Sequence, residues 1–230
     1  MNNSVRSTAR LVGAGLRALL VLTVVCGVIY PLVVTGIAQA AFHGKANGSE
    51  VTVDGKSVGS ERLGQSYNLP DKKDKDGNPL PDPKYFQPRP SAAGPNAENT
   101  QYKLIVSGAS NLAADSKTLL DAVKQRRADV AAFNHADPSA VPVDALTASA
   151  SGLDPDISPA YARLQAKRVA EANGLPAATV EKLVEDHVDG RILGFMGEER
   201  VNVLKLNVAL RELAGCRTAG KTSVAHDCFQ

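Results

Sequence analysis

The residues best suited to chemistry in this chain lie in polar stretches that glycine and proline interrupt. In the stretch 85–92 (YFQPRPSA), Arg89 stands between Pro88 and Pro90, so a stiff backbone carries its guanidinium. Such a fixed group suits a carboxylate or a row of carbonyl oxygens, because it offers five donors in a planar fork. The stretch 107–112 (SGASNL) offers backbone N–H groups and short polar side chains, which suit an anion or the backbone of a partner.

Three more stretches have the same character, at residues 59–65, 147–159 and 201–210. Together the five stretches supply the candidate partner-binding or ligand-binding residues Gln65, Arg89, Ser91, Ser107, Gly108, Ser110, Asn111, Asp154, Asn202 and Asn207. Each stretch alone is also compatible with ordinary turn chemistry, since Gly, Pro, Asn, Asp and Ser dominate turns. We expect Arg89 to be exposed, so that its truncation leaves the domain stable.

The sequence lacks the motifs that mark common enzymes. It contains no GxxxxGK[ST] phosphate loop, no GxSxG elbow, no HExxH and no DKTG segment of a phosphorylated transport ATPase. Asp74-x-Asp76-Gly77 resembles the start of a calcium loop, but Lys72 and Pro83 would stand at the first and last ligand positions. We therefore expect no catalytic residue, no metal site and no tightly bound cofactor, and a third possibility, an exported hydrolase, is disfavoured.

Capping residues and helical spacing predict the elements that position these stretches. The predicted helices run from Lys117 to about Asn134 behind a cap at Asp115 or Ser116, from Pro159 to Asn173 behind Ser158, onward from near Pro176, and onward from Asn202. The first is expected to bury Leu119, Leu120, Val123, Val130 and Phe133, and the last Val203, Leu206, Leu210 and Leu213. Strands are predicted at Val58–Tyr67 and Arg191–Met196, and an exposed loop at 70–83. Several helices with few strands indicate a small α/β (α+β) domain.

A stretch of 25 residues, from Ala18 to Phe42, carries no charged side chain. As a helix it would span about 37 Å, against about 30 Å for the hydrocarbon core of a bilayer. Every charge before residue 43 is positive and the first acidic residue is Glu50, which predicts a cytoplasmic N-terminus. We expect one transmembrane helix in the cell (inner) membrane and an extracytoplasmic domain after it.

A cleaved secretory signal is the alternative, because Ala38-Gln39-Ala40 has the small-x-small form of a cleavage site. Pro31 is expected to kink the span. The kinked helix is either a lone anchor in the lipid bilayer or packs against partner helices, for which Gly27 and Gly36 would permit close approach.

The predicted organisation is a basic cytoplasmic N-terminus (1–17), a transmembrane helix (18–42), a tether (43–57), an extracytoplasmic domain (58–213) and a tail (214–230). Of 26 Lys and Arg residues, three precede residue 43, which leaves 23 against 24 Asp and Glu. Such a near-neutral domain is not expected to bind nucleic acid. Cys216 and Cys228 either form a disulfide on the oxidising side of the membrane or remain two free thiols.

Taken together, the polar stretches resemble the C subunit of the Kdp-type potassium-transporting ATPase. The resemblance rests on Tyr30-Pro31-Leu32 in the span, followed in order by GSxxxGQ, YFxxRPSA, SGxSNL, TASxSGLDPxIS and VNVLxLNxAL. It covers nearly the whole chain. Tyr67 stands where that family usually has Phe, Ala109 replaces a glycine, and the loop 70–84 is longer.

The resemblance implies a non-catalytic subunit whose partners are a channel-like K⁺-selective subunit and an ATP-hydrolysing P-type subunit. The family is described as a catalytic chaperone that raises the ATP affinity of the P-type subunit in a transient ternary complex. An extracytoplasmic domain has no access to cytoplasmic ATP, so the predicted topology favours coupling through the membrane spans. A signal-anchored binding module or assembly chaperone unrelated to ion transport is the alternative.

Overall fold

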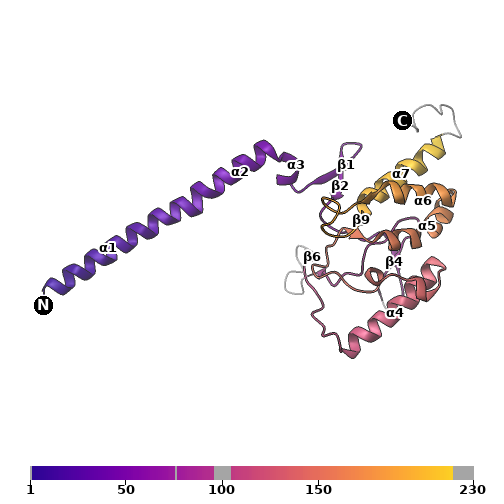
Figure 1. The fold of residues 1–230 in the computed structure, drawn as a ribbon, viewed down its shortest axis with the longest axis horizontal. Helices are drawn as coiled ribbons and strands as arrows, with labels where there is room; N and C mark the ends of the chain where they lie inside the picture. Colours follow the sequence, from indigo (N-terminus) through magenta and orange to yellow (C-terminus); the bar gives the residue numbers. More distant parts are fainter. Residues whose placement is uncertain (1, 76, 96–104, 220–230) are drawn as a thin grey trace. The chain divides into compact units, whose positions relative to one another are not determined.

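The structure is a computed structural model that describes residues 2–75, 77–95 and 105–219 (Figure 1). The chain divides into two compact units, Met1–Ser49 and Glu50–Gln230. The first consists of helix, and the second combines helices with short antiparallel strands.

The first unit contains one long apolar helix. α1 (Asn2–Val24) continues through a π-helical turn (Val25–Ile29) into α2 (Tyr30–Ala41), and the short α3 (His43–Ala46) follows. Within it, Val5–Ala41 is long and apolar enough to cross a membrane, and its most apolar window is not buried by the rest of the chain. The helical stretch thus begins well before Ala18.

The π-helical turn ends directly before Tyr30-Pro31. Proline has no N–H and its ring crowds the preceding turn of a helix. The Tyr30 N–H donates to the Val25 carbonyl, five residues back, so the ladder changes its pattern just before the proline. Local π geometry of this kind lets a membrane helix accommodate proline.

Two antiparallel hairpins open the second unit, where the sequence predicted irregular structure. β1 (Glu50–Val53) pairs with β2 (Lys56–Ser60), and β3 (Asn68–Lys73) pairs with β4 (Pro79–Pro81). The prediction that 70–83 is a loop without strands was therefore wrong, although most of this segment is exposed. The assignment of 43–57 as a tether stays a prediction, and its last residues belong to the first hairpin. In the first hairpin, Asp54-Gly55 has positive φ at both residues, which is the turn chemistry that joins such strands.

The second hairpin has its own closing device. The Asp74 carboxylate accepts hydrogen bonds from the N–H of Asn78 at 2.8 Å and from its side-chain amide at 3.0 Å. Asp74, which resembled a calcium ligand, thus closes a turn. The strand predicted at Val58–Tyr67 stops at Ser60, and the chain is irregular beyond it because Gly64 donates to the carbonyl of Leu153 at 2.8 Å.

The helices of the second unit begin at the predicted caps. They are α4 (Lys117–Asn134) behind Ser116, α5 (Pro159–Asn173) behind Ser158, α6 (Ala177–Asp186) behind Pro176 and α7 (Val203–Ala219) behind Asn202. Short 3₁₀ turns occupy Pro138–Ala140 and Val143–Ala145. The buried stripe predicted for α4 was partly wrong, since Leu120 is 48% exposed. The buried residues of α4, Ala131 and Asn134, lie at its C-terminal end.

A small antiparallel sheet has the strand order β7 (Asp156–Ile157), β9 (Arg200–Asn202), β8 (Val188–Asp189). A separate pair joins β5 (Gly94–Pro95) to β6 (Ile105–Val106). The strand predicted at Arg191–Met196 was wrong: this segment is a tight turn with a single bridge between Ile192 and Met196. Gly194, with φ 80°, interrupts the extended run.

The core contains residues of α5, α6, α7 and β9. Its fully buried members include Ala162, Ala166, Val169, Val180, Val184, Val201, Leu206 and Leu210. Phe86, from the irregular stretch between β4 and β5, is also fully buried in this cluster. The second unit is thus the small α/β domain that the sequence predicted, and α5 and α7 hold the stretch around Phe86.

Candidate functional site

Two buried side-chain amides hold the stretch that contains Arg89. The Asn207 Oδ1 accepts from the Phe86 N–H and its Nδ2 donates to the Phe86 carbonyl, both at 2.9 Å. The Gln165 side chain does the same to Gln87, at 2.7 Å to the N–H and 3.1 Å to the carbonyl. Each side-chain amide thus pairs with both the N–H and the carbonyl of one residue, as a neighbouring β-strand would do for an extended segment. The pair, one from α7 and one from α5, forms an amide clamp on residues 86–87.

Arg168 supports the amide clamp through a hydrogen bond to Gln165. It is 4% exposed, and it donates to Asn134 Oδ1 and Gln165 Oε1, both at 2.9 Å, and to the Tyr85 carbonyl at 3.1 Å. Its guanidinium also bonds to the Pro83 carbonyl and lies 4.4 Å from the centre of the Phe133 ring. Burial lowers the pKa of Arg168 to about 10.

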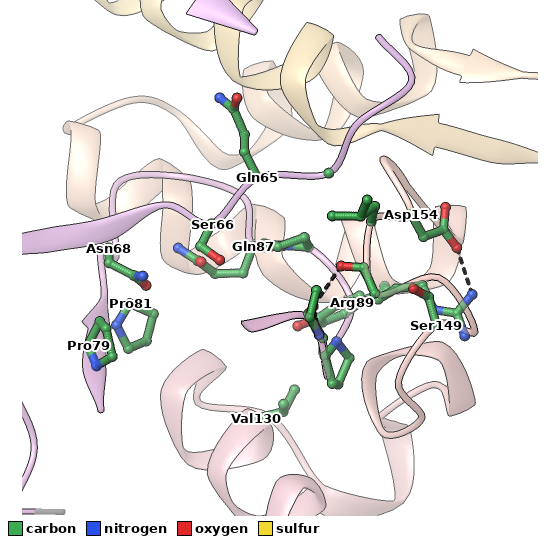
Figure 2. A pocket seen from close by; sticks show the side chains of 18 of the residues that line it. Gln65, Ser66, Asn68, Pro79, Pro81, Gln87, Arg89, Val130, Ser149 and Asp154 are labelled. Atoms are coloured by element: carbon green, nitrogen blue, oxygen red, sulfur yellow. Dashed lines mark hydrogen bonds and ion pairs between the residues drawn. The ribbon is translucent and has the colours of Figure 1, made fainter. Parts of the chain in front are cut away.

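The orientation of Arg89 follows from this support. Its Nη1 lies 2.9 Å from Asp154 Oδ2 (Figure 2). Its Nη2 donates to the Thr147 carbonyl at 3.4 Å. The sequence predicted that this guanidinium suits a carboxylate or carbonyls, and both are found within the same chain. The expectation that Arg89 is exposed was wrong, since its side chain is 25% exposed.

Backbone carbonyls of the stretch 147–159 accept hydrogen bonds from the predicted stretches 85–92 and 107–112. The Ser91 hydroxyl donates to the Gly152 carbonyl at 2.6 Å, and the Ser107 hydroxyl donates to the Ser151 carbonyl at 2.8 Å. The Gly108 N–H also donates to Ser151, at 3.0 Å. The hydroxyls of Ser91 and Ser107 therefore position the loop that carries Asp154.

Two glycines permit this close packing. A Cβ at Gly64 would collide with the Asp154 carbonyl oxygen and lie 3.0 Å from its carbon. A Cβ at Gly152 would lie 2.7 Å from the N and Cβ of Ala93, and Gly152 also has φ 68°. Glycine is thus required at both positions by a close approach, and at Gly152 also by the backbone conformation.

A cavity of about 610 Å³ opens between these stretches, bordered by Gln65, Gln87, Arg89, Ser91, Ser149 and Asp154 together with residues of α4 (Figure 2). Two buried donors at its wall, Arg89 Nε and Ser149 Oγ, have no hydrogen-bond partner among the described residues. Both could donate to the carbonyl oxygen of a bound group. The cavity therefore suits a polar, acceptor-bearing segment.

A second hollow of about 370 Å³ adjoins the ion pair and is bordered mainly by acidic side chains. Asp156 lies in it, 3.2 Å from Arg200 Nε. Burial raises the pKa of Asp156, although the Asn202 amide and Arg200 oppose the shift. The carboxylates around Arg89 make its surroundings unfavourable for a phosphate.

Of the remaining predicted residues, two make hydrogen bonds within the domain and two are exposed. Asn202 is 7% exposed, donates to Asp156 Oδ1 at 3.0 Å and to the Glu61 carbonyl at 2.9 Å, and caps α7. Gln65 donates to the Tyr67 hydroxyl at 3.0 Å. Ser110 and Asn111 lie exposed in the segment before α4.

The structure therefore pairs Arg89 with Asp154 and joins Ser91, Ser107 and Gly108 to residues 151–152 of the same loop, and these residues form the Arg89 cluster. Gln65 borders the same cavity, Asn202 bonds to Asp156 two residues after Asp154, and Asn207 holds Phe86 in the stretch that carries Arg89. Pro31 belongs to the other unit. The disulfide predicted between Cys216 and Cys228 lies outside the described residues, because residues 220–230 are not described. Its formation stays a prediction.

Sequence reasoning missed the buried polar residues Asn134, Gln165 and Arg168. They lie inside helices, where Gln and Arg usually face solvent. One signal was available for two of them: in α5, Gln165 and Arg168 occupy the same face as Ala162 and Val169, which the capped helix Pro159–Asn173 turns toward the core.

The chain thus combines one candidate membrane helix with a small α/β domain. Its polar stretches meet around the loop that carries Asp154. The family model described as "K+-transporting ATPase, c chain" (KdpC) matches residues 12–212. Among similar proteins, the potassium-transporting ATPase KdpC subunit of Streptomyces avermitilis is 59% identical, with 93% of this chain and 98% of that protein covered. That of Streptomyces coelicolor is 57% identical over 93% and 97%, and that of Mycobacterium tuberculosis 45% identical over 86% and 96%.

The chain therefore belongs to the KdpC family of potassium-transporting ATPase subunits. This confirms the resemblance found in the sequence motifs. It also decides against a binding module or chaperone unrelated to ion transport. The candidate membrane helix is consistent with a membrane-anchored subunit.

Proposed function

We propose that this chain is a non-catalytic accessory subunit of a high-affinity, ATP-driven K⁺ uptake complex. Its partners are a channel-like K⁺-selective subunit and an ATP-hydrolysing P-type subunit, whose assembly and turnover it supports. The observation that carries the proposal is the convergence of the family's motif stretches on a rigid cluster, in which the serines Ser91 and Ser107 bind backbone carbonyls. Such serines position a surface and do not act as nucleophiles.

The proposed topology places the N-terminus in the cytoplasm and residues 50–230 outside the cell membrane. Its support is the charge pattern, in which Arg6, Arg10 and Arg17 precede the span and the first acidic residue follows it. In this orientation the domain has no contact with cytoplasmic ATP. Any increase in the ATP affinity of the P-type subunit then passes through the membrane helix and partner spans, and ATP itself binds only to the partner.

The Arg89 cluster is the proposed partner-facing surface of the domain. Arg89 Nε and Ser149 Oγ have no hydrogen-bond partner in the part of the chain that the structure describes, and leaving such buried groups unpaired is costly. A small movement of the cluster on association would let an acceptor from another subunit, such as a backbone carbonyl, reach and satisfy these donors. Asp154 holds the guanidinium in place before the partner binds, which reduces the ordering cost of association.

The experiment compares two arginine variants in cells that depend on this complex for growth at low K⁺. Arg89→Lys keeps the charge but loses the planar fork, and should reduce both growth and co-purification of the partner subunits. Arg163→Ala is the matched control, because Arg163 forms a bidentate pair with Glu185 at 2.6 and 2.9 Å but both side chains are 51% exposed. Normal assembly and growth of Arg89→Lys would refute the role of this surface.

A further inference from the structure

An apolar turn protrudes from the domain next to the β7–β9–β8 sheet and takes no part in the Arg89 cluster. Its four large side chains are strongly exposed: Ile192 58%, Leu193 79%, Phe195 71% and Met196 49%. No other part of residues 50–95 or 105–215, as far as the structure describes them, exposes four large apolar side chains within five residues. Such a concentration marks an interaction site.

The exposure is enforced by the backbone. Ile192 and Met196 exchange two backbone hydrogen bonds, both at 2.9 Å, and the Gly194 N–H donates to the Arg191 carbonyl at 3.0 Å. Leu193, at the tip, has φ 54°, a left-handed conformation that is unfavourable for leucine. The closed turn therefore holds the leucine side chain exposed, in a strained backbone conformation. Such a side chain is preorganised to act as an anchor for a partner.

The charges around the turn favour protein over lipid as the occupant. Arg191, Glu198 and Glu199 flank it, and the next residue, Arg200, lies 3.2 Å from Asp156 and 3.8 Å from Asp189. With Arg200 engaged by these carboxylates, the remaining rim is net acidic and would be repelled by an anionic bilayer. An apolar centre with a charged rim is the usual anatomy of a protein interface.

We propose that the apolar turn Ile192–Met196 docks into an apolar, basic-rimmed pocket on the extramembrane face of another subunit of the K⁺-transporting ATPase. This inference rests on the proposed function, since it requires the chain to assemble with those subunits. It adds a second contact, made by the apolar turn itself, next to the hollow that Arg89, Glu198 and Glu199 border. Leu193 and Phe195, the most exposed side chains, are its anchors.

The test uses the full chain, co-expressed with the other subunits of its complex. Phe195→p-benzoylphenylalanine places a photo-crosslinker on the turn, and mass spectrometry identifies the adduct. An adduct with another subunit is expected. Adducts with lipid alone or with a second copy of this chain, or the absence of any adduct, would overturn the proposal.

A second measurement quantifies the anchor. Leu193→Ser and Phe195→Ser should each lower the co-purified partner about tenfold or more, as loss of an interface anchor does. Val143→Ser is the control, because Val143 is 72% exposed in a different part of the domain, and it should change nothing. If the turn variants co-purify normally, this inference fails while the proposed function stands. If the wild-type chain does not co-purify, both fail.

Discussion

Replacing Asn207 by leucine tests whether the amide clamp holds the functional cluster together. Asn207 is 1% exposed and Phe86 is fully buried. Asn207→Leu keeps a side chain of similar volume but removes both hydrogen bonds to Phe86. A buried N–H and a buried carbonyl are then left without partners.

The cost follows from those two groups. A buried polar group that loses its partner costs about 1–3 kcal/mol, so the free energy of unfolding should fall by about 2–6 kcal/mol. A domain has about 5–15 kcal/mol in total. The variant should therefore be near the limit of folding, and the stretch that carries Arg89 should be released first, because Asn207 and Gln165 hold it.

Asn173→Leu is the matched control. Asn173 also donates to the backbone of this stretch, to the Lys84 carbonyl at 2.8 Å, but at the surface, where water replaces the lost bond. Its cost should stay below about 1 kcal/mol. Urea unfolding of the full chain in mild detergent, followed by near-ultraviolet circular dichroism, measures both, since every tyrosine except Tyr30 belongs to the second unit. Equal destabilisation by the two variants would refute the clamp.

Three further outcomes are expected. Gly64→Ala should destabilise the domain by about 1–3 kcal/mol, because its Cβ would collide with the Asp154 carbonyl. Gly190→Ala is the control and should melt like the wild type, because the space around Gly190 is open. Burial raises the pKa of Tyr161 to about 12 from 10.0, so the folded state retains a proton that the unfolded state loses, and the contribution of this group to stability falls as pH rises from 10 to 12. Arg168, whose pKa burial lowers to about 10, contributes in the opposite sense over the same range. The comparison is therefore between variants: Tyr161→Phe should gain stability relative to the wild type as pH rises from 10 to 12 in alkaline melting curves. Protease added to sealed right-side-out membranes should digest residues 50–230, and protection of the domain would reverse the proposed orientation.

The sequence predicted the structure correctly where a few neighbouring residues determine it, as at helix ends. Ser158-Pro159 and Asn173-Gly174 bound α5 as predicted, because N-capping and left-handed C-capping depend on single residues. The hairpins were missed because their polar residues suggested loops, although Asp54-Gly55 in the first and Asp76-Gly77 in the second are both dipeptides typical of hairpin turns. Strand pairing depends on partners distant in sequence, and periodicity within one segment does not reveal them.

The sequence predicted which residues belong to the candidate site but not which of them interact. The five polar stretches indicated Arg89 and Asp154 separately, and the 2.9 Å ion pair between them joins residues 65 positions apart. For Gln165 and Arg168 the only local signal was their place on the same face of α5 as Ala162 and Val169, which says that they are buried but not what they bind, and a polar residue in a helix is normally solvated. Their role comes from the carbonyl and N–H groups of the stretch packed on α5.

The most direct test of the central proposal compares ATP hydrolysis by the purified complex with and without this chain. The account predicts that the complete complex hydrolyses ATP with K⁺ transport, that the partners alone assemble poorly or turn over slowly, and that the isolated chain hydrolyses no ATP. Hydrolysis by the isolated chain, or full activity of partners purified without it, would contradict the assignment of a non-catalytic accessory subunit.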